Sequence, residues 1–409
     1  MTSALVLLLV TTATADTGEP QNTCVACHSI LPEPLNLPVQ GMKGDIHGEK
    51  GLSCVDCHGG DATAMAIEVS MSPEKGFRGK PKHEDIPAFC GRCHSDPAYM
   101  RRFNPRLPTD QLQQYWTSVH GQRLQQGDQK VATCVSCHGV HGILPPDRAQ
   151  SRVFAANVPE TCGHCHADAE YMAGYGIPTD QKEKYTHSVH GEMLLVQRDL
   201  SAPACNDCHG NHGAFPPGAS SIAEVCGQCH ANNAALFIKS PHKRAFNAQG
   251  LPECAACHGN HDIHRTSDSM LGTDEGAVCR RCHTPGTPGY DAAAKMHDVV
   301  DQLKTVMANA ETLLGKASQM GMEVSDEQYA FRESVRPQLI KVRTETHLAN
   351  ADTVVQLAQE GIRSAGASAA AARATLEEAE ARRRHLLGPL ALIVLLALLL
   401  YLKLRQIER

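Results

Sequence analysis

Aromatic residues are scarce in this sequence: eight Phe, eight Tyr and one Trp make up 4% of its 409 residues. A chain of this length is expected to form two or three domains, and this aromatic share is thin for cores of that size. Basic patches interleaved with aromatic side chains are also lacking, so nothing points to nucleic acid as a partner. Between residues 16 and 290 neither the strand period nor the helix period is sustained. We therefore expect short helices and loops there, with almost no sheet.

No cysteine stands alone, because all 18 fall in nine C-x-x-C-H blocks. Cysteines in this number are compatible with a disulfide framework, zinc sites or attached haem. A disulfide framework has no need of a histidine after every second cysteine, and zinc sites built from C-x-x-C pairs do not require the adjacent histidine. The spacing therefore predicts c-type haem attachment. The blocks are Cys24/Cys27/His28, Cys54/Cys57/His58, Cys90/Cys93/His94, Cys134/Cys137/His138, Cys162/Cys165/His166, Cys205/Cys208/His209, Cys226/Cys229/His230, Cys254/Cys257/His258 and Cys279/Cys282/His283.

The spacing suits haem because each residue of a block has its own task. The two thiols add to the haem vinyl groups, and the adjacent histidine is the proximal iron ligand. Nine blocks thus predict nine covalently attached haem c groups, whose apolar discs would fill the core that the aromatic side chains leave empty. Glycine follows four of the blocks, and we expect it to let the backbone turn close to the macrocycle. These glycines are Gly59, Gly139, Gly210 and Gly259.

Internal repeats organise the blocks. Residues 107–124 and 177–194 match at 10 of 18 positions with an offset of 70 residues, and each leads into two blocks. A third unit begins near Lys239, and a degenerate fourth unit begins earlier in the chain, at Gly44. Four two-haem units and the N-terminal block at Cys24 account for the nine haems.

Each unit supplies two further histidines, which we predict to be distal iron ligands. One precedes the first block of the unit, and the other lies three residues beyond the proximal histidine of that block. In the earliest unit Asp61 holds the second of these positions, and His83 is expected to substitute for it. The predicted distal ligands are His47, His83, His120, His141, His190, His212, His242 and His261.

A ninth distal ligand is needed, and two histidines compete for this role. His297 follows the last block closely and is favoured over His347, which lies farther along the chain in a segment that is predicted to be helical. Methionine is the competing ligand type and raises the haem potential. Met100 and Met172 each lie six residues beyond a proximal histidine, but another unit has leucine and phenylalanine at the matching place, which favours packing. The remaining histidines, read as spare, are His164, His187, His264 and His385.

The two ends of the chain predict export and membrane anchoring. An apolar run over residues 4–10 precedes an A-x-A-like signal, so residues 1–15 are expected to be a cleaved signal peptide. Residues 386–402 are 17 residues without a charge, covering roughly 25 Å as a helix, and are predicted to cross the membrane. Export would leave the haems outside the cytoplasmic membrane and residues 403–409 in the cytoplasm. The arginines at 382–384 oppose this orientation, but the signal peptide is the stronger constraint.

Between the haem region (16–290) and the membrane segment, residues 291–385 are predicted to form a helical hairpin or stalk. One helix is expected over 291–319, ending around Gly321. A capping box at 325–328 would open another, bent at Pro337 and loosened near Gly361. The alternative is a flexible linker.

Two stretches of one unit resemble the multihaem cytochrome c superfamily: SVHG at 188–191 and CNDCHGNHG at 205–213. This superfamily comprises exported, cytochrome c3-like electron-transfer proteins with doubled C-x-x-C-H motifs. The resemblance covers roughly residues 20–300 and implies closely packed haems, bis-histidine ligation and long-range electron transfer. The chain departs from the quinol dehydrogenases of this superfamily that carry an N-terminal anchor, and this difference disfavours direct quinol oxidation.

The predicted fold is mainly α with extensive irregular loops around nine haems, followed by the stalk and one transmembrane helix. The expected function is electron transfer between a membrane respiratory complex and an exported acceptor. A role as a subunit of such a complex is compatible with this function. The alternative is a reductase or dehydrogenase of a small nitrogen or sulfur compound with one open haem. All nine proximal ligands are histidine, which disfavours this alternative, and no catalytic residue is predicted. The Cys24 haem, outside the paired units, is one candidate for an open site.

Overall fold

The structure is a computed structural model that describes residues 22–218 and 221–408. Over these residues the chain is mainly helical and contains no β-strand. It divides into two compact units, Met1–Pro216 and Pro217–Arg409. The predicted boundary at residue 290 lies inside the second unit, which combines the last three blocks with the C-terminal helices. The predicted signal peptide, residues 1–15, lies outside the described residues.

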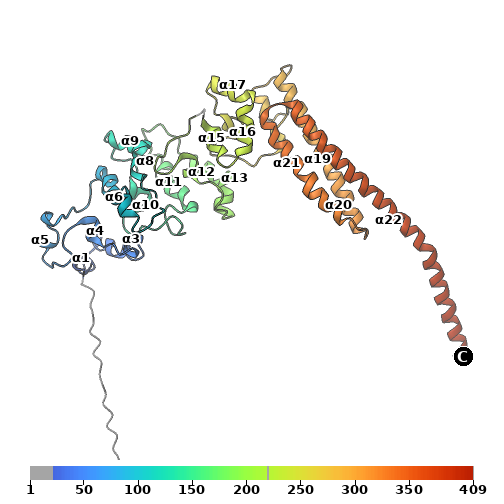
Figure 1. The fold of residues 1–409 in the computed structure, drawn as a ribbon, viewed down its shortest axis with the longest axis horizontal. Helices are drawn as coiled ribbons and strands as arrows, with labels where there is room; N and C mark the ends of the chain where they lie inside the picture. The colour runs from blue at the N-terminus through green and yellow to red at the C-terminus, as the bar shows by residue number, and fades with distance from the viewer. Residues whose placement is uncertain (1–21, 219–220, 409) are drawn as a thin grey trace, which may run out of the picture. The chain divides into compact units, whose positions relative to one another are not determined.

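Short helices and loops make up the first unit, as the lack of a sustained period predicts (Figure 1). Several of these helices end at a proximal histidine because the next residue is glycine with a positive φ, for example 84° at Gly139 and 82° at Gly210. The helices are α1 (Thr23–His28), α2 (Leu37–Gly41), α3 (Ile46–Glu49), α4 (Cys54–His58), α5 (Ile67–Ser70), α6 (Ile86–His94), α7 (Pro97–Met100), α8 (Gln111–Thr117), α9 (Val119–Gln125), α10 (Cys134–His138), α11 (Val158–His166), α12 (Gln181–Thr186), α13 (Val189–Gly191) and α14 (Cys205–His209).

The second unit passes from short helices to long ones. Its first four helices surround the Cys226 and Cys254 blocks, and the block at Cys279 begins a single 3-10 turn, Cys279–Arg281. The long helices follow where the composition changes to alanine, glutamate and leucine, which are strong helix formers. The helices are α15 (Ile222–Gly227), α16 (Ala231–Lys239), α17 (Pro241–Gln249), α18 (Glu253–His258), α19 (Pro288–Gln319), α20 (Ser325–Ala330), α21 (Arg336–Glu345) and α22 (Ala351–Ile407).

Helices α19 and α22 run side by side and form the largest hydrophobic core of the described residues (Figure 1). Leu303 of α19 and Val354 of α22 are both fully buried. A stripe of small residues on α22 includes Gly361, where an added Cβ would lie only 3.0 Å from Cδ1 of Leu303. Glycine here permits close helix contact, and α22 runs through it without a break. The predicted loosening at Gly361 is therefore wrong.

The connection from α19 to α22 differs in detail from the sequence prediction. Gly321, with φ 77°, follows the end of α19 as expected. Helix α20 begins at Ser325, but its N-cap residue is Val324 and the predicted capping box does not form. A π-helical turn, Phe331–Val335, precedes Pro337, which lies in the first turn of α21. Proline is tolerated there because its missing N–H has no helical partner to lose.

Helix α22 extends through the apolar segment to Ile407. It is the one helix of the described residues that is long and apolar enough to cross a membrane, with a mean hydropathy of 2.4 over its most apolar window. Its leucines from Leu386 onward are exposed because nothing else in the described chain packs on them. This helix fits a single-pass membrane protein.

Candidate functional site

Seven of the nine blocks end an α-helix at their proximal histidine: α1, α4, α6, α10, α11, α14 and α18. Side chains fix the start of several of these helices. Asp56 Oδ2 accepts from the backbone N–H of Ser53 at 2.7 Å, and Asp207 Oδ2 accepts in the same way from Ala204 at 2.7 Å. The two cysteines of each of these blocks, three residues apart, therefore share one helix face. No disulfide joins the cysteines within the described residues.

Four predicted haem-binding residues are exposed to solvent: Cys208, Cys229, His230 and Cys282. For three of them the local backbone is the reason. Helix α15 ends at Gly227, before Cys229 and His230, and the 3-10 turn of the last block ends at Arg281, before Cys282. Cys208 lies within α14, whose other cysteine packs against the buried cluster around Leu194. The polypeptide alone therefore leaves these four residues uncovered.

Successive blocks lie next to each other. The Cys90 thiol interacts electrostatically with that of Cys134 in the next block, and Cys162 interacts with Cys205 in the same way. In the second unit Cys226 interacts with Cys254. Similar interactions link further neighbouring blocks: Cys24 with Cys54, Cys57 with Cys93, Cys137 with Cys162, and Cys257 with Cys279. The blocks thus follow one another in space in chain order, from the first to the sixth in one unit and from the seventh to the ninth in the other.

Six proximal histidines each face a histidine outside the blocks. Five of these partners are predicted distal ligands, and the sixth is the second candidate for the ninth ligand. The ring centroids are about 6 Å apart in every pair: His47 with His94 (6.0 Å), His58 with His141 (6.3 Å), His120 with His166 (6.1 Å), His138 with His212 (6.1 Å), His242 with His283 (5.9 Å) and His258 with His347 (6.0 Å).

This separation fits a metal ion between the rings. A metal–nitrogen bond of about 2 Å on each side, plus about 1 Å from each nitrogen to its ring centre, places two opposed imidazole centroids roughly 6 Å apart. Packed aromatic rings occur over a wider range, about 4.5–7 Å. The pairing itself discriminates further, because every one of the six pairs joins a block histidine to a non-block histidine. The residues present therefore fit six bis-histidine haem sites.

Backbone and side-chain acceptors orient several of these rings. His58 Nδ1 lies 2.9 Å from the carbonyl oxygen of Gly79, and His347 Nδ1 lies 2.9 Å from that of Thr344. An Nδ1–H that donates to such an oxygen leaves Nε2 to bind a metal, which is the usual arrangement for ligating histidine. His28 has the same contact, 2.9 Å to the Leu35 carbonyl.

Burial keeps many of the paired rings neutral. It lowers the pKa of His138 to about 4, with the nearby His212 as the second cause. Burial is also the largest cause of the lowered pKa of His94, His120, His141, His166, His212, His242 and His258. Neutral imidazole is the form that ligates metals.

The repeated SVHG segments share one local structure that places the distal histidine. Ser188 Oγ accepts from the N–H of Gly191 at 3.0 Å and donates to the carbonyl of Tyr185 at 2.7 Å, and Ser118 makes the same bonds in its repeat. A Cβ on Gly191 would come within 2.0 Å of the Tyr185 carbonyl oxygen, so this turn requires glycine. The result is a tight turn around His190.

Tyrosines in these repeats tie the distal-histidine segment to the following block, a role that motif reasoning missed. The hydroxyl of Tyr115 donates to the carbonyl of Ala132 at 2.9 Å, and that of Tyr185 donates to Pro203 at 2.8 Å. Each acceptor lies two residues before the first cysteine of a block. The repeat could have indicated this role, because the tyrosine is identical in the two aligned repeats. The third unit has Phe237 in this place and cannot form the bond.

Asp45 is a second residue that the motifs did not indicate. Its side chain is 1% exposed and receives four hydrogen bonds. Oδ1 accepts from the backbone N–H of His47 at 2.8 Å and lies 3.0 Å from His47 Nδ1. Oδ2 accepts from the N–H groups of Gly142 and Ile143, both at 2.8 Å. One carboxylate thus anchors His47 and the loop that carries His141.

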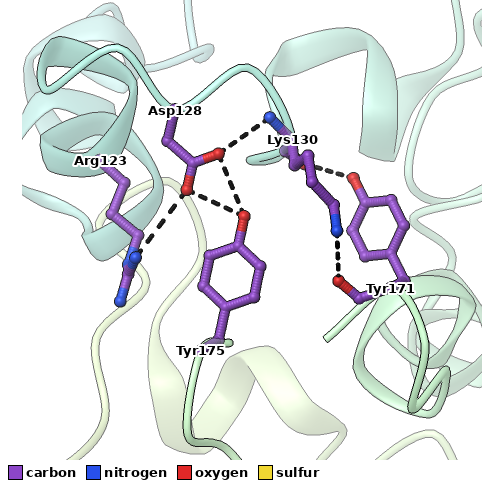
Figure 2. Close-up of polar contacts among 5 residues, drawn as sticks. All are labelled: Arg123, Asp128, Lys130, Tyr171 and Tyr175. Atoms are coloured by element: carbon purple, nitrogen blue, oxygen red, sulfur yellow. Dashed lines mark hydrogen bonds and ion pairs between the residues drawn. The ribbon is translucent and has the colours of Figure 1, made fainter. Parts of the chain in front are cut away.

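A polar cluster joins the segments before Cys134 and after His166 (Figure 2). Asp128 accepts from the hydroxyl of Tyr175 at 2.9 Å and from the N–H of Lys130 at 3.0 Å, and Arg123 lies 3.8 Å away. Lys130 Nζ donates to the backbone carbonyl of Tyr171 at 2.7 Å and also lies over the aromatic ring of Tyr171. These contacts stabilise the spacing between two blocks of one unit.

The structure does not bring every predicted ligand against a proximal histidine. His83 Nε2 lies 2.9 Å from the Val131 carbonyl, and within the described chain no histidine ring faces it. His297 packs against Gly272, and its Nδ1 lies 3.5 Å from Asp298, so the geometry favours His347 for the ninth position. Met100 and Met172 are buried among helices. His190, in α13, and His261, after α18, each make further side-chain contacts.

No protein-family profile, curated protein or solved structure matches the chain.

Proposed function

We propose that the chain is a membrane-anchored multihaem cytochrome c that carries electrons between a membrane respiratory partner and an exported acceptor. The observation that carries the proposal is the set of six block-to-non-block histidine pairs with ring centroids 5.9–6.3 Å apart. Nine covalently bound haem c groups would supply one-electron redox chemistry at irons held between two imidazoles.

The chain's own residues would attach, orient and space these groups. The block cysteines provide the thioether links, and the contacts between neighbouring blocks support a row of redox sites in chain order. Acceptors at Nδ1 fix the ring orientations, which is one way in which a protein tunes a metal site. Six sites closed by two histidines each favour electron transfer over substrate turnover.

Small cores around the blocks also support the proposal. The hydrophobic clusters of the first unit have only a few buried members, such as Leu124 and Leu194. Large apolar side chains are exposed there, including Ile30 at 85%, Met65 at 69% and Val140 at 63%. Attached porphyrin would supply the apolar contacts that such side chains lack in the polypeptide. Helix α22 supports the proposed anchor.

The test is expression in a bacterial host that attaches c-type haem, followed by intact-mass measurement and electron paramagnetic resonance of the oxidised protein. We expect a mass gain of nine haems and a spectrum dominated by low-spin iron. Replacing His212, which faces His138, with Ala is expected to convert one haem to high spin. The control is His187→Ala, because the His187 ring bonds to the Glu183 carbonyl rather than facing a proximal histidine. A chain without covalent haem, or equal spectra for the two variants, would overturn the proposal.

A further inference from the structure

The histidine pairs follow one rule along the chain. A histidine that precedes a unit's first block faces the second block of the same unit: His47, His120 and His242 face His94, His166 and His283, respectively. The histidine three residues beyond a unit's first proximal histidine faces the first block of the preceding unit. His141 thus faces His58, and His212 faces His138.

This rule extends one step back, to the N-terminal block. Its sequence, CVACH, is of the same type as CVDCH at Cys54 and CVSCH at Cys134, which are first blocks, although Ser29 rather than glycine follows it. The residue that should face His28 is therefore the one three residues beyond His58. That residue is Asp61, where the later units have histidine. Within the described residues, no imidazole ring faces His28, whose Nδ1 contact is the Leu35 carbonyl.

The structure holds Asp61 beside this block. Thr23, the first residue of α1, donates to the Ala62 carbonyl through both its N–H (2.9 Å) and its hydroxyl (2.8 Å). The carboxylate of Asp61 acts electrostatically on the Cys24 thiol. It accepts from the N–H and hydroxyl of Thr63, at 3.0 and 2.6 Å, and Lys75 Nζ lies 3.7 Å from its Oδ2. Its position is therefore defined without a bound group.

We propose that Asp61 lies on the distal side of the haem attached at Cys24 and Cys27, which leaves this haem without a second histidine and open to a small, uncharged, protic ligand such as water. This inference rests on the proposed function. A carboxylate accepts a hydrogen bond from such a ligand and repels anions. By the same rule His190 and His261 would close the Cys226 and Cys205 haems, as imidazole closes the six paired sites, so the Cys24 haem is the one left open to a small molecule.

The test uses the haem-loaded full chain, with spin state and ligand binding as the readouts. We expect one high-spin haem in the wild type and one equivalent of carbon monoxide bound after reduction. Asp61→His should convert this haem to low spin and abolish carbon monoxide binding. Asp61→Asn should keep it high-spin and strengthen the binding of azide several-fold, because the repelling charge is gone. His83→Ala, at the substitute ligand predicted from the sequence, should leave the spectrum unchanged, and His187→Ala, whose ring bonds to the Glu183 carbonyl, is the matched control.

Each contrary result has a distinct meaning. A protein with nine haems that are all low-spin overturns the inference and leaves the proposed function standing, whereas a protein without covalent haem overturns the proposed function. An Asp61→His variant that stays high-spin removes Asp61 from the distal position. A new high-spin signal in His83→Ala would make His83 the ligand, as the sequence alone suggested. Unchanged azide affinity in Asp61→Asn would refute the preference for uncharged ligands.

Discussion

Asp45→Asn is the most informative single change, because one buried carboxylate holds two predicted ligands. Each oxygen of Asp45 receives two hydrogen bonds, from His47 on one side and from Gly142 and Ile143 on the other. Asparagine keeps one acceptor oxygen and turns its amide N–H₂ toward two N–H groups, so two bonds to a charged acceptor are lost. At about 1.5–3 kcal/mol each, we expect a loss of roughly 3–6 kcal/mol in the free energy of unfolding.

The same change should alter a redox potential. Asp45 Oδ1 lies 3.0 Å from His47 Nδ1, which places the negative charge roughly 7 Å from an iron held by that ring. At an effective dielectric constant of about 20 this charge stabilises the ferric form by about 2.4 kcal/mol. Removing it should raise the potential of that haem by on the order of 100 mV, using about 59 mV for 1.4 kcal/mol.

Urea unfolding and a spectroscopic redox titration measure the two effects. Asp199→Asn is the control, because Asp199 accepts only from the N–H and hydroxyl of Ser201 at the surface. We expect the control to change the free energy of unfolding by less than about 0.5 kcal/mol and to leave every potential in place. If Asp45→Asn behaves like this control, the carboxylate does not position His47 and the reasoning fails.

Four further predictions concern the fold and the anchor. Tyr185→Phe should lower the free energy of unfolding by about 1 kcal/mol because the bond to Pro203 is lost; a urea series checks this, and no change would contradict it. Leu303→Ala, at a fully buried position, should destabilise the second unit by about 2–5 kcal/mol in thermal unfolding. In the haem-free chain the pKa of His138 is lowered to about 4, so the unfolded state binds more protons below pH 6.5. Stability should therefore fall between about pH 6.5 and 4 in acid titration, and less so in a His138→Gln variant. Truncation before Leu386 should move the protein from the membrane fraction to the soluble fraction. Its far-ultraviolet circular dichroism should fall only by the contribution of the helical residues that are removed.

Local features were predictable from the sequence because they depend on neighbouring residues. Four of the C-x-x-C-H helices end where glycine follows, and α19 occupies the predicted range almost completely. The loosening at Gly361 was mispredicted because propensity ignores packing: on α22 that glycine lies against Leu303, and tertiary contact overrides its weak helix preference. Similarly, the 325–328 pattern matches a capping box, but Ser325 bonds to Glu323 instead.

Ligand pairing was beyond the reach of the motifs. The repeat shows which histidines recur but not which block each one faces, since that depends on contacts between segments far apart in the chain. His141 reaches His58 for two reasons. Gly41 leaves room for the His141 side chain, because a Cβ added to Gly41 would lie 2.7 Å from the Cβ of His141. Asp45 also binds the loop that carries His141. Neither contact has a signature in a single sequence. Proximity along the chain favoured His297 as the ninth ligand, whereas it is the His347 ring that lies 6.0 Å from a proximal histidine, His258.

The rule of pairing explains why His347 has this role. In the proposed cytochrome a unit's first haem would take its distal ligand from the next unit, and no further C-x-x-C-H block follows the two blocks of the unit at Cys254. The helical bundle supplies the missing group: His347 lies in the 3-10 turn Thr346–Leu348, between α21 and α22, and its ring is 6.0 Å from that of His258. Asn350, three residues on, caps α22 by accepting from the N–H of Thr353 at 3.1 Å. The segment that begins α22 is therefore the one that would close this haem site, so in the proposed cytochrome the last helices would contribute to the redox site as well as to the anchor.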